Sequence, residues 1–439
     1  MTRARLGLAT LLAGLSGLLA LAAAPGCTRD PSTMLRLMIW GAPDEIRVVQ
    51  SYLDAFKQVH PEIQVKVEHA PDLGYRQRLQ TLLRGDNLAD VMYVDQADLA
   101  WMAEQGGLMD LTPLVERDRE ELRPEDFFQK PFEHYRHQGR LWGILKDFAT
   151  LCVYYNRDLF DKWDVPYPQA GWTWDDFLAA AKGVCREGDW GFLLETWAGE
   201  LFPWIWQAGG EIATSAPEPR WLTGDPRYLD GSAEGLQFLS DLIWEHKVAP
   251  GPSITRDQQG TALFLQGKVA MCTYGRWAHM QFRHIKDFDW DVVEMPRHPD
   301  RPPATCMFTV CYGIARTTRH PEKAWTLLKF LVSPEAQEMV AHSGQAIPAR
   351  KSIAESPSFL RPRALAGREV AARPHFAQVE VGRFPPRFST YARAEQYFVE
   401  AVQPLWNRPP GDREPGKRTA REILIGIQPT LEELVAGRR

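Results

Sequence analysis

Near its start, the chain alternates short strand patterns with longer helical patterns. Residues 35–40 form a short apolar run, residues 45–59 carry apolar side chains at helical spacing, and residues 63–68 alternate apolar with polar side chains. A second helical pattern follows over residues 75–83, and a third strand pattern over residues 90–95. Helices between consecutive strands act as crossovers that join parallel strands. The pattern therefore predicts an α/β fold with mostly parallel sheets flanked by helices.

The length of the chain predicts more than one lobe. Single hydrophobic cores stop growing beyond roughly 250–300 residues, whereas this chain has 439. Its formal net charge of −5 argues against a nucleic-acid-binding protein, which would favour a basic face. After the apolar N-terminal stretch, no apolar run is long enough to cross a membrane, so we expect the body of the protein to be soluble.

The N-terminus carries a predicted export signal. Arg3 and Arg5 precede an apolar stretch over residues 6–24, and small residues then lead to Cys27. A basic start, an apolar middle and small residues before a cleavage site are typical of secretory signals, and the ending on cysteine resembles a bacterial lipoprotein signal. We predict a signal peptide over residues 1–26, lipidation of Cys27 and an extracytoplasmic location, anchored to the membrane by lipid. Plain secretion and an uncleaved membrane anchor remain alternatives.

Cysteine usage predicts neither a disulfide framework nor a metal site. Besides Cys27, the chain has an odd number of cysteines with no C-x-x-C spacing, and a core of this size does not need disulfides. We expect most of them to be small buried residues, and we expect no cofactor and no metal. The five cysteines are Cys152, Cys185, Cys272, Cys306 and Cys311.

Tryptophan is unusually abundant. The chain has 16 Trp, many of them clustered between residues 172 and 277. Most must pack in the core, but some could form a stacking surface for flat-faced ligands such as sugar rings. Strand polarity points to two further positions, because ligands of open α/β sheets lie beyond the carboxyl ends of strands. Trp40 and Asp95 stand at such ends.

Several segments carry strand ends, helix starts and the Tyr-Tyr-Asn-Arg-Asp-Leu-Phe and Trp-Thr-Trp-Asp-Asp-Phe strings: residues 37–41, 87–93, 143–160, 172–177, 264–271, 321–325 and 333–337. In this order, they resemble segments of the extracellular solute-binding proteins of ABC importers, the large sugar-binding family that includes maltose-binding protein. The order and spacing of these segments behind an export signal carry the resemblance, since each string alone is weak.

The resemblance implies a two-lobed periplasmic-binding-protein type II fold joined by a hinge. The first lobe would comprise residues 34–147 plus about 308–346, and the second lobe residues 148–307 plus about 347–439. It also implies a monomer that closes around its ligand and docks on the transmembrane subunits of an ABC permease. These boundaries come from the resemblance, with which the strand and helix pattern agrees.

The implied ligand contacts are carboxylates, aromatic rings and one arginine from both lobes: Trp40, Asp44, Asp95, Asp147, Glu195, Trp197, Trp204, Arg276 and Trp277. Carboxylates accept strong hydrogen bonds from sugar hydroxyls, and aromatic rings stack on the apolar faces of sugars. Alternatives stay open: Asp44 and Asp95 could cap helices, and Arg276 could form a surface ion pair. Of the clustered Trp197, Trp204 and Trp206, at least one should be core.

These residues predict a binding protein for a neutral mono- or oligosaccharide, and not an enzyme. The sequence lacks the G-x-S-x-G, H-E-x-x-H, P-loop and G-x-G-x-x-G motifs. Two alternatives remain. Arg276 could bind a carboxylate or phosphate, as in a sugar acid or glycerol phosphate, and the many carboxylates leave a carbohydrate-active hydrolase open.

Overall fold

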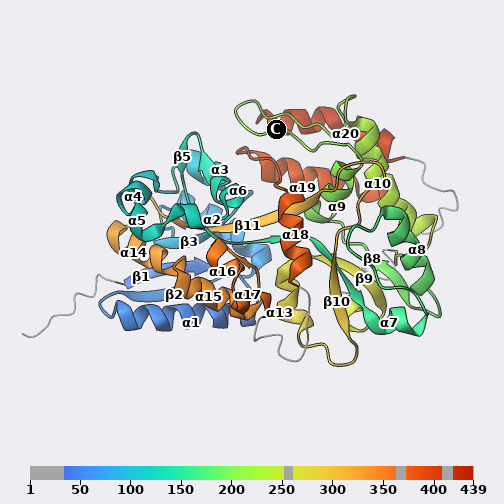
Figure 1. The fold of residues 1–439 in the computed structure, drawn as a ribbon. Helices are drawn as coiled ribbons and strands as arrows, with labels where there is room; N and C mark the ends of the chain where they lie inside the picture. The colour runs from blue at the N-terminus through green and yellow to red at the C-terminus, as the bar shows by residue number, and fades with distance from the viewer. Residues whose placement is uncertain (1–33, 252–260, 362–371, 408–418, 439) are drawn as a thin grey trace, which may run out of the picture.

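The computed structural model describes residues 34–251, 261–361, 372–407 and 419–438, and in these ranges the chain forms two lobes side by side (Figure 1). The predicted signal peptide over residues 1–26 and the lipidation site Cys27 lie outside the described residues. Each lobe has its own buried apolar core built around a β-sheet. The predicted two-lobed α/β fold is therefore confirmed.

The first lobe contains a seven-stranded sheet in the order β12-β6-β11-β3-β1-β2, with β13 (Gly382–Arg383) also paired to β11. The strands β1 (Met34–Ile39), β2 (Gln64–His69) and β3 (Val91–Asp95) are parallel, joined by α1 (Pro43–Val59) and α2 (Asp72–Arg84). The other elements of this lobe are α3 (Leu99–Glu104), α4 (Thr112–Arg117), α5 (Arg119–Leu122), η2 (Pro124–Asp126), α6 (Gln129–Glu133), β4 (Arg136–His137), β5 (Arg140–Leu141), α14 (Pro321–Leu331) and α15 (Pro334–Ser343).

Helix α1 shows how local sequence sets this architecture. Val49, Leu53 and Phe56 are buried at helical spacing and face the sheet. The helix begins after Ala42, whose backbone N–H donates to Glu45 Oε2 at 2.7 Å. Asp44 does not cap the helix, so that alternative is wrong: Glu45 satisfies the exposed end instead.

The second lobe contains a four-stranded sheet in the order β10-β7-β9-β8, formed by β7 (Cys152–Asn156), β8 (Trp190–Leu193), β9 (Val269–Tyr274) and β10 (Trp290–Glu294). The helix α8 (Trp174–Val184) begins with a capping box, in which Thr173 and Asp176 bond reciprocally. The other elements here are α7 (Arg157–Lys162), α9 (Ala198–Gln207), α10 (Leu229–Trp244), α12 (Ala262–Leu265), η3 (Arg276–Ala278), α13 (His279–Phe282), α19 (Tyr391–Ala401), η5 (Gln403–Leu405) and α20 (Ala420–Val435).

Strand direction is more mixed than the predicted, mostly parallel sheets. In the second lobe only β8 and β9 pair in parallel, whereas β7 is antiparallel to both β9 and β10. In the first lobe, β11 (Thr305–Ile314) runs antiparallel to β3 and to β6 (Ile144–Thr150). The strands β6 and β7 carry the chain out of the first lobe and β11 brings it back, so no crossover helix holds them to the parallel direction.

The chain crosses between the lobes close to two of the predicted points. β6 ends at Thr150 and β7 begins at Cys152, with Leu151 N–H donating to Cys306 at 3.1 Å. The long strand β11 provides the return path, and β12 (Ile347–Pro348) pairs with β6. These crossing strands meet beside α18 (Arg373–Val381), which packs on strands of both sheets where the lobes join (Figure 1).

The predicted boundary near residue 347 is wrong for the last return to the second lobe. α16 (Lys351–Ala354) and α17 (Pro357–Leu360) pack against α15, and Phe359 is fully buried in the first core. The first lobe therefore continues to at least Leu360. The apolar side chains of these short helices complete the core beside α15. No motif in the sequence indicated this packing.

The five described cysteines are all free thiols. All of them except Cys185 are buried, in agreement with the expectation that most are small buried residues. No helix within the described ranges has both the length and the apolarity that a membrane span requires. Those ranges also hold no group of three or more His, Cys, Asp and Glu side chains placed to bind a metal ion.

Candidate functional site

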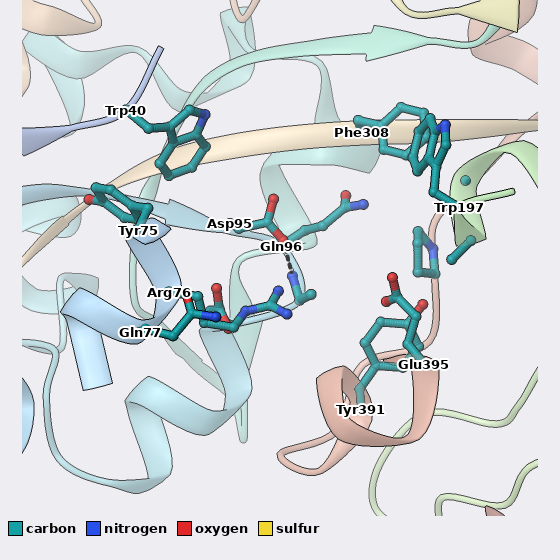
Figure 2. A pocket seen from close by; sticks show the side chains of 15 residues that line it. Trp40, Tyr75, Arg76, Gln77, Asp95, Gln96, Trp197, Phe308, Tyr391 and Glu395 are labelled. Carbon is teal, nitrogen blue, oxygen red and sulfur yellow. Dashed lines mark hydrogen bonds and ion pairs between the residues drawn. The ribbon is translucent and has the colours of Figure 1, made fainter. Parts of the chain in front are cut away.

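A pocket of about 350 Å³ lies between the two lobes. Figure 2 shows its two walls, with side chains from β1, α2 and the end of β3 on one side and from the start of α9 and from α19 on the other. The hinge strand β11 contributes Phe308. The lining residues are Trp40, Tyr75, Arg76, Gln77, Asp95, Gln96, Ala97, Asp98, Trp197, Ala198, Gly199, Phe308, Pro385, Tyr391 and Glu395.

Trp40 forms the aromatic part of the first-lobe wall. It directly follows β1, and its ring packs edge-on against Tyr75 at 4.7 Å and Tyr93 at 5.1 Å. The Tyr75 hydroxyl, which bonds the carbonyl groups of Met38 and Tyr93 at 3.1 and 2.9 Å, ties α2 to the strand ends. These contacts fix the orientation of the Trp40 ring at the pocket, so its half-buried face is available before any ligand binds.

Asp95 ends β3 and provides a carboxylate beside Trp40. Its Oδ1 accepts the backbone N–H of Ala97 at 2.8 Å. Burial, and then the neighbouring charge of Asp98, raise the pKa of Asp95 to about 7. The helix α3 has Asp98 at its N-cap position, so Asp95 holds the preceding turn and does not cap the helix.

Arg76 and Asp98 form an ion pair at the floor of the same wall. Arg76 Nε lies 2.7 Å from Asp98 Oδ1, and Asp98 is buried. Burial raises the pKa of Asp98, and Arg76 opposes that rise. The guanidinium is thus engaged by a carboxylate of its own lobe.

The second-lobe wall is dominated by Trp197, at the N-cap position of α9. Its ring lies 5.2 Å from the ring of Phe308, and Trp277 lies 5.3 Å from Phe308 in an edge-on contact. Gly199 permits this approach, because a Cβ at that position would come within 2.1 Å of the Trp197 ring and 2.5 Å of Phe308. Phe308 thus joins two predicted tryptophans, although only Trp197 lines the pocket.

Helix α19 supplies two lining residues that the sequence reasoning missed. Tyr391 is buried, and Glu395 is half-buried with its pKa raised by burial. Figure 2 shows Glu395 on the wall opposite Arg76 and Asp95. No motif in the sequence indicated which part of the C-terminal segment faces the cleft. The lining residues Arg76, Gln96 and Phe308 were also not predicted, because no motif marks them, although Gln96 directly follows the predicted Asp95.

Two predicted carboxylates lie at the lobe junction but outside the pocket lining. Asp44 makes an ion pair with Arg283 of the second lobe, and His284 Nε2 lies 3.1 Å from the same carboxylate. These partners lower the pKa of Asp44, the hydrogen bond from His284 most. Asp147 is 6% exposed and pairs with the adjacent Lys146 inside the sheet.

The Lys146 ammonium explains the position of Asp147. Lys146 Nζ lies 5.0 Å from the centre of the Tyr93 ring, the same ring that supports Trp40. The pair therefore lies behind the pocket wall. A buried pair of this kind needs each partner to satisfy the other, and Lys146 is the partner of Asp147.

The predicted second-lobe residues Glu195 and Trp204 also lie outside the lining. Glu195 accepts a hydrogen bond from the Tyr274 hydroxyl. Trp204 is 0% exposed and stacks on Phe238 at 5.2 Å. The prediction of Trp204 as a ligand contact is wrong, because α9 directs this side chain into the core. Trp206 is buried as well, in agreement with the expectation that at least one tryptophan of this cluster belongs to the core.

Arg276 is the clearest correction. Its side chain is 0% exposed, and its guanidinium lies 4.2 Å from the centre of the Phe359 ring of the first lobe. Burial lowers the pKa of Arg276 to about 10. Both expectations for Arg276, a ligand contact and a surface ion pair, are contradicted, because α17 covers it from the other lobe.

Two α/β lobes around a pocket at their junction define a two-lobed ligand-binding protein. Residues 42–338 match the family described as Bacterial extracellular solute-binding protein. The chain belongs to this family, and it is an extracytoplasmic solute-binding protein.

Curated and solved relatives resemble the chain over most of its length. The galactooligosaccharide-binding protein of Bacillus subtilis (strain 168) is 22% identical over 359 residues, covering 78% of this chain and 79% of that protein. An ABC substrate-binding protein of Listeria monocytogenes, solved in complex with cycloalternan, superposes with a TM-score of 0.82 at 23% identity, covering 92% and 99% of the two chains. Maltose-bound MalE3 of T. maritima has a TM-score of 0.75 at 21% identity, covering 91% and 99%.

Proposed function

We propose that this protein binds a mono- or oligosaccharide in the pocket between its lobes and delivers it to an ABC-type membrane importer. One observation carries the proposal: aromatic rings and carboxylates from both lobes converge on a single pocket. Trp40 and Trp197 stand on opposite walls, and Asp95 and Glu395 stand beside them (Figure 2).

The chemistry of this lining suits a sugar. A sugar ring presents apolar C–H faces, on which Trp40 and Trp197 can stack, and hydroxyl groups at its edge. Carboxylates accept these hydroxyl protons in hydrogen bonds stronger than those between neutral groups. A pocket shielded by both lobes excludes competing water, which strengthens each of these contacts.

The relatives support the same class of ligand. The Bacillus subtilis protein is named for galactooligosaccharide binding, and the structures from Listeria monocytogenes and T. maritima hold cycloalternan and maltose. An anionic solute fits less well, because the pocket is lined by the carboxylates Asp95, Asp98 and Glu395 and by one arginine. Arg276, which favoured the anionic alternative, is buried away from the pocket.

Binding without turnover is the expected activity. Family members are binding proteins, and a glycosidase would need two carboxyl groups flanking one scissile bond. Incubation of the purified protein with oligosaccharides tests this point: intact sugar supports the binding role, and cleavage products would support the hydrolase.

Closure of the lobes is the proposed mechanism of capture. Only a closed form offers the contacts of both walls at once, so a ligand that touches both walls favours that form. The Asp44–Arg283 ion pair is one contact between the lobes that closure would make. The closed, loaded protein would then dock as a monomer on the transmembrane subunits of the permease.

A lipid on Cys27 would keep the protein at the membrane beside that permease. The sequence before Cys27 carries this part of the proposal. Expression of Cys27→Ala in a bacterial host that processes lipoproteins tests it. The variant should leave the membrane fraction, and mass spectrometry should find no acyl chains at its N-terminus. Membrane retention of the variant would favour an uncleaved anchor instead.

The ligand itself is tested by a thermal-shift screen of mono- and oligosaccharides, followed by calorimetry on those that raise Tm. Binding of at least one neutral or positively charged saccharide, lost in Trp197→Ala, supports the proposal. The absence of any saccharide that raises Tm, together with a shift produced by sugar acids or glycerol phosphate alone, would overturn it.

A further inference from the structure

The walls of the pocket carry more acidic than basic side chains. The lining contains Asp95, Asp98 and Glu395 against a single cationic side chain, Arg76. Arg76 is already paired with Asp98 at 2.7 Å. Asp95 and Glu395 therefore face the pocket as a surplus of negative charge, one from each lobe (Figure 2).

An unpaired acceptor in the same lining points to the same kind of ligand. Gln96 is 6% exposed and lines the pocket. Its Nε2 donates to the carbonyl group of Met307 at 3.3 Å, which fixes the amide so that Oε1 is its free acceptor. That Oε1 is buried and has no hydrogen-bond partner. A buried acceptor without a donor is costly, so the bound ligand is expected to bring a donor to it.

We propose that the pocket selects a saccharide carrying a protonated amino group, with the ammonium bound between Asp95, Glu395 and Gln96 Oε1. This inference rests on the proposed function of the pocket as a saccharide site. An ammonium has three donors and no acceptor, which matches a set of acceptors and two anionic groups. A hydroxyl could donate one hydrogen bond but would leave the surplus charge uncompensated.

The titration of the two carboxylates is consistent with this arrangement. Burial and the charge of Asp98 raise the pKa of Asp95 to about 7, and burial raises the pKa of Glu395. The other groups facing them are Arg76, which lowers both pKa values, and the Tyr391 hydroxyl beside Glu395. An ammonium in the same position would lower both pKa values and restore the ionised forms.

The test compares sugars that differ only in the substituent at C2 of each ring. Calorimetry at about pH 6.5, where the sugar amine is protonated, measures Kd for glucose, galactose, mannose and cellobiose. The same measurement is made for the 2-amino counterparts glucosamine, galactosamine, mannosamine and the glucosamine dimer, and for their N-acetyl forms. We expect at least one amino sugar to bind roughly tenfold more tightly than both its hydroxyl and its N-acetyl counterpart, because its hydrogen bonds are charge-assisted.

Variants assign the preference to these side chains. Glu395→Gln and Asp95→Asn should each reduce the ratio of amino-sugar to parent-sugar affinity to about threefold or less, as expected when one charged acceptor is removed. Glu400→Gln is the matched control, because Glu400 is an exposed residue of the same helix and lies outside the lining. It should leave the ratio unchanged. Tm of each variant without sugar shows that it is folded.

The outcomes separate this inference from the function on which it rests. Neutral sugars that bind as tightly as their amino counterparts, or an amine preference that survives both Asp95→Asn and Glu395→Gln, would overturn the inference and leave the saccharide site intact. Binding of neither series, nor of any oligosaccharide in the thermal-shift screen, would overturn the proposed function as well.

Discussion

The rings of Trp197 and Phe308 lie 5.2 Å apart, and they connect the start of α9 in the second lobe to the strand β11 that joins the lobes. The ring of Trp277 also lies 5.3 Å from that of Phe308, in an edge-on contact. The pocket wall is therefore attached to the element that passes between the lobes. A change in the orientation of either ring would alter both the stacking surface and the contact between α9 and β11.

The first prediction concerns Gly199 in the first turn of α9, where the absence of a side chain leaves room for the rings of Trp197 and Phe308. In Gly199→Ala the new Cβ would meet the Trp197 ring at 2.1 Å and Phe308 at 2.5 Å. We expect displacement of Trp197 and a loss of saccharide affinity of roughly tenfold, or about 1.4 kcal/mol. Calorimetry measures it. The control is Gly426→Ala in α20, which has open space and should keep full affinity. Equal affinity of both variants would contradict the role of Gly199.

The second prediction separates two tryptophans of the same segment. Trp197→Ala should weaken saccharide binding by about 1–3 kcal/mol, because a stacking ring is lost from the pocket, with little change in Tm. Trp204→Ala should instead lower the free energy of unfolding by about 3–5 kcal/mol, because it leaves a cavity in the core. Urea unfolding and calorimetry distinguish them. A Trp204→Ala protein of normal stability would show that the ring is not core.

The third prediction concerns Trp277. Its ring supports Phe308 without lining the pocket, so Trp277→Ala should weaken binding with little loss of fold. We expect a smaller loss than for Trp197→Ala, of about 1 kcal/mol, the usual value of an aromatic pair. Unchanged calorimetric affinity would remove Trp277 from the site, and a loss equal to that of Trp197→Ala would indicate that it contacts the sugar directly.

The fourth prediction tests the ion pair between Asp44 and Arg283. Asp44→Asn and Arg283→Gln should each weaken saccharide binding several-fold, or by about 1 kcal/mol, because the pair joins the lobes of the closed form. The double variant should lose no more than either single variant. X-ray scattering of the sugar-bound proteins provides a second measurement, in which the variants should keep a larger radius of gyration. Additive losses would show that the residues act separately.

The fifth prediction concerns pH and Asp95. Burial and the charge of Asp98 raise the pKa of Asp95 to about 7 in the folded protein, whereas an aspartate of the unfolded chain has a pKa of about 3.9. The folded protein therefore holds the proton of the Asp95 carboxyl more tightly than the unfolded chain does. Ionisation of Asp95 therefore costs stability as the pH rises from about 4 to 7. Asp95→Asn should show no gain near pH 4 and a gain above pH 7 of about 1–2 kcal/mol, reduced by solvent screening at this half-buried side chain.

Urea unfolding across this pH range measures the difference for Asp95→Asn. Asp287→Asn, at an exposed aspartate outside the pocket lining, is the control and should follow the wild-type protein at every pH. A constant offset between Asp95→Asn and the wild type, independent of pH, would show that the charge of Asp95 costs the folded state nothing.

Local patterns were sufficient where a residue's environment depends on its immediate neighbours in the chain. The alternation of strands and helices fixed the α/β class, and the reciprocal bonds of Thr173 and Asp176 follow from a spacing of three residues. Trp40 and Asp95 could be placed at one sheet edge, because the carboxyl ends of parallel strands meet there. Both line the pocket.

Only the tertiary structure decided which side chains the second lobe and the tail present to the pocket. Glu395 reaches it because α19 packs beside α9, far away in sequence, and Arg276 is excluded because α17 of the other lobe covers it. Trp197 and Trp204 look alike in the sequence, yet the start of α9 faces the cleft and its next turns face the core. Burial depends on the packing of elements distant in the chain, and no periodicity within one segment can specify that packing.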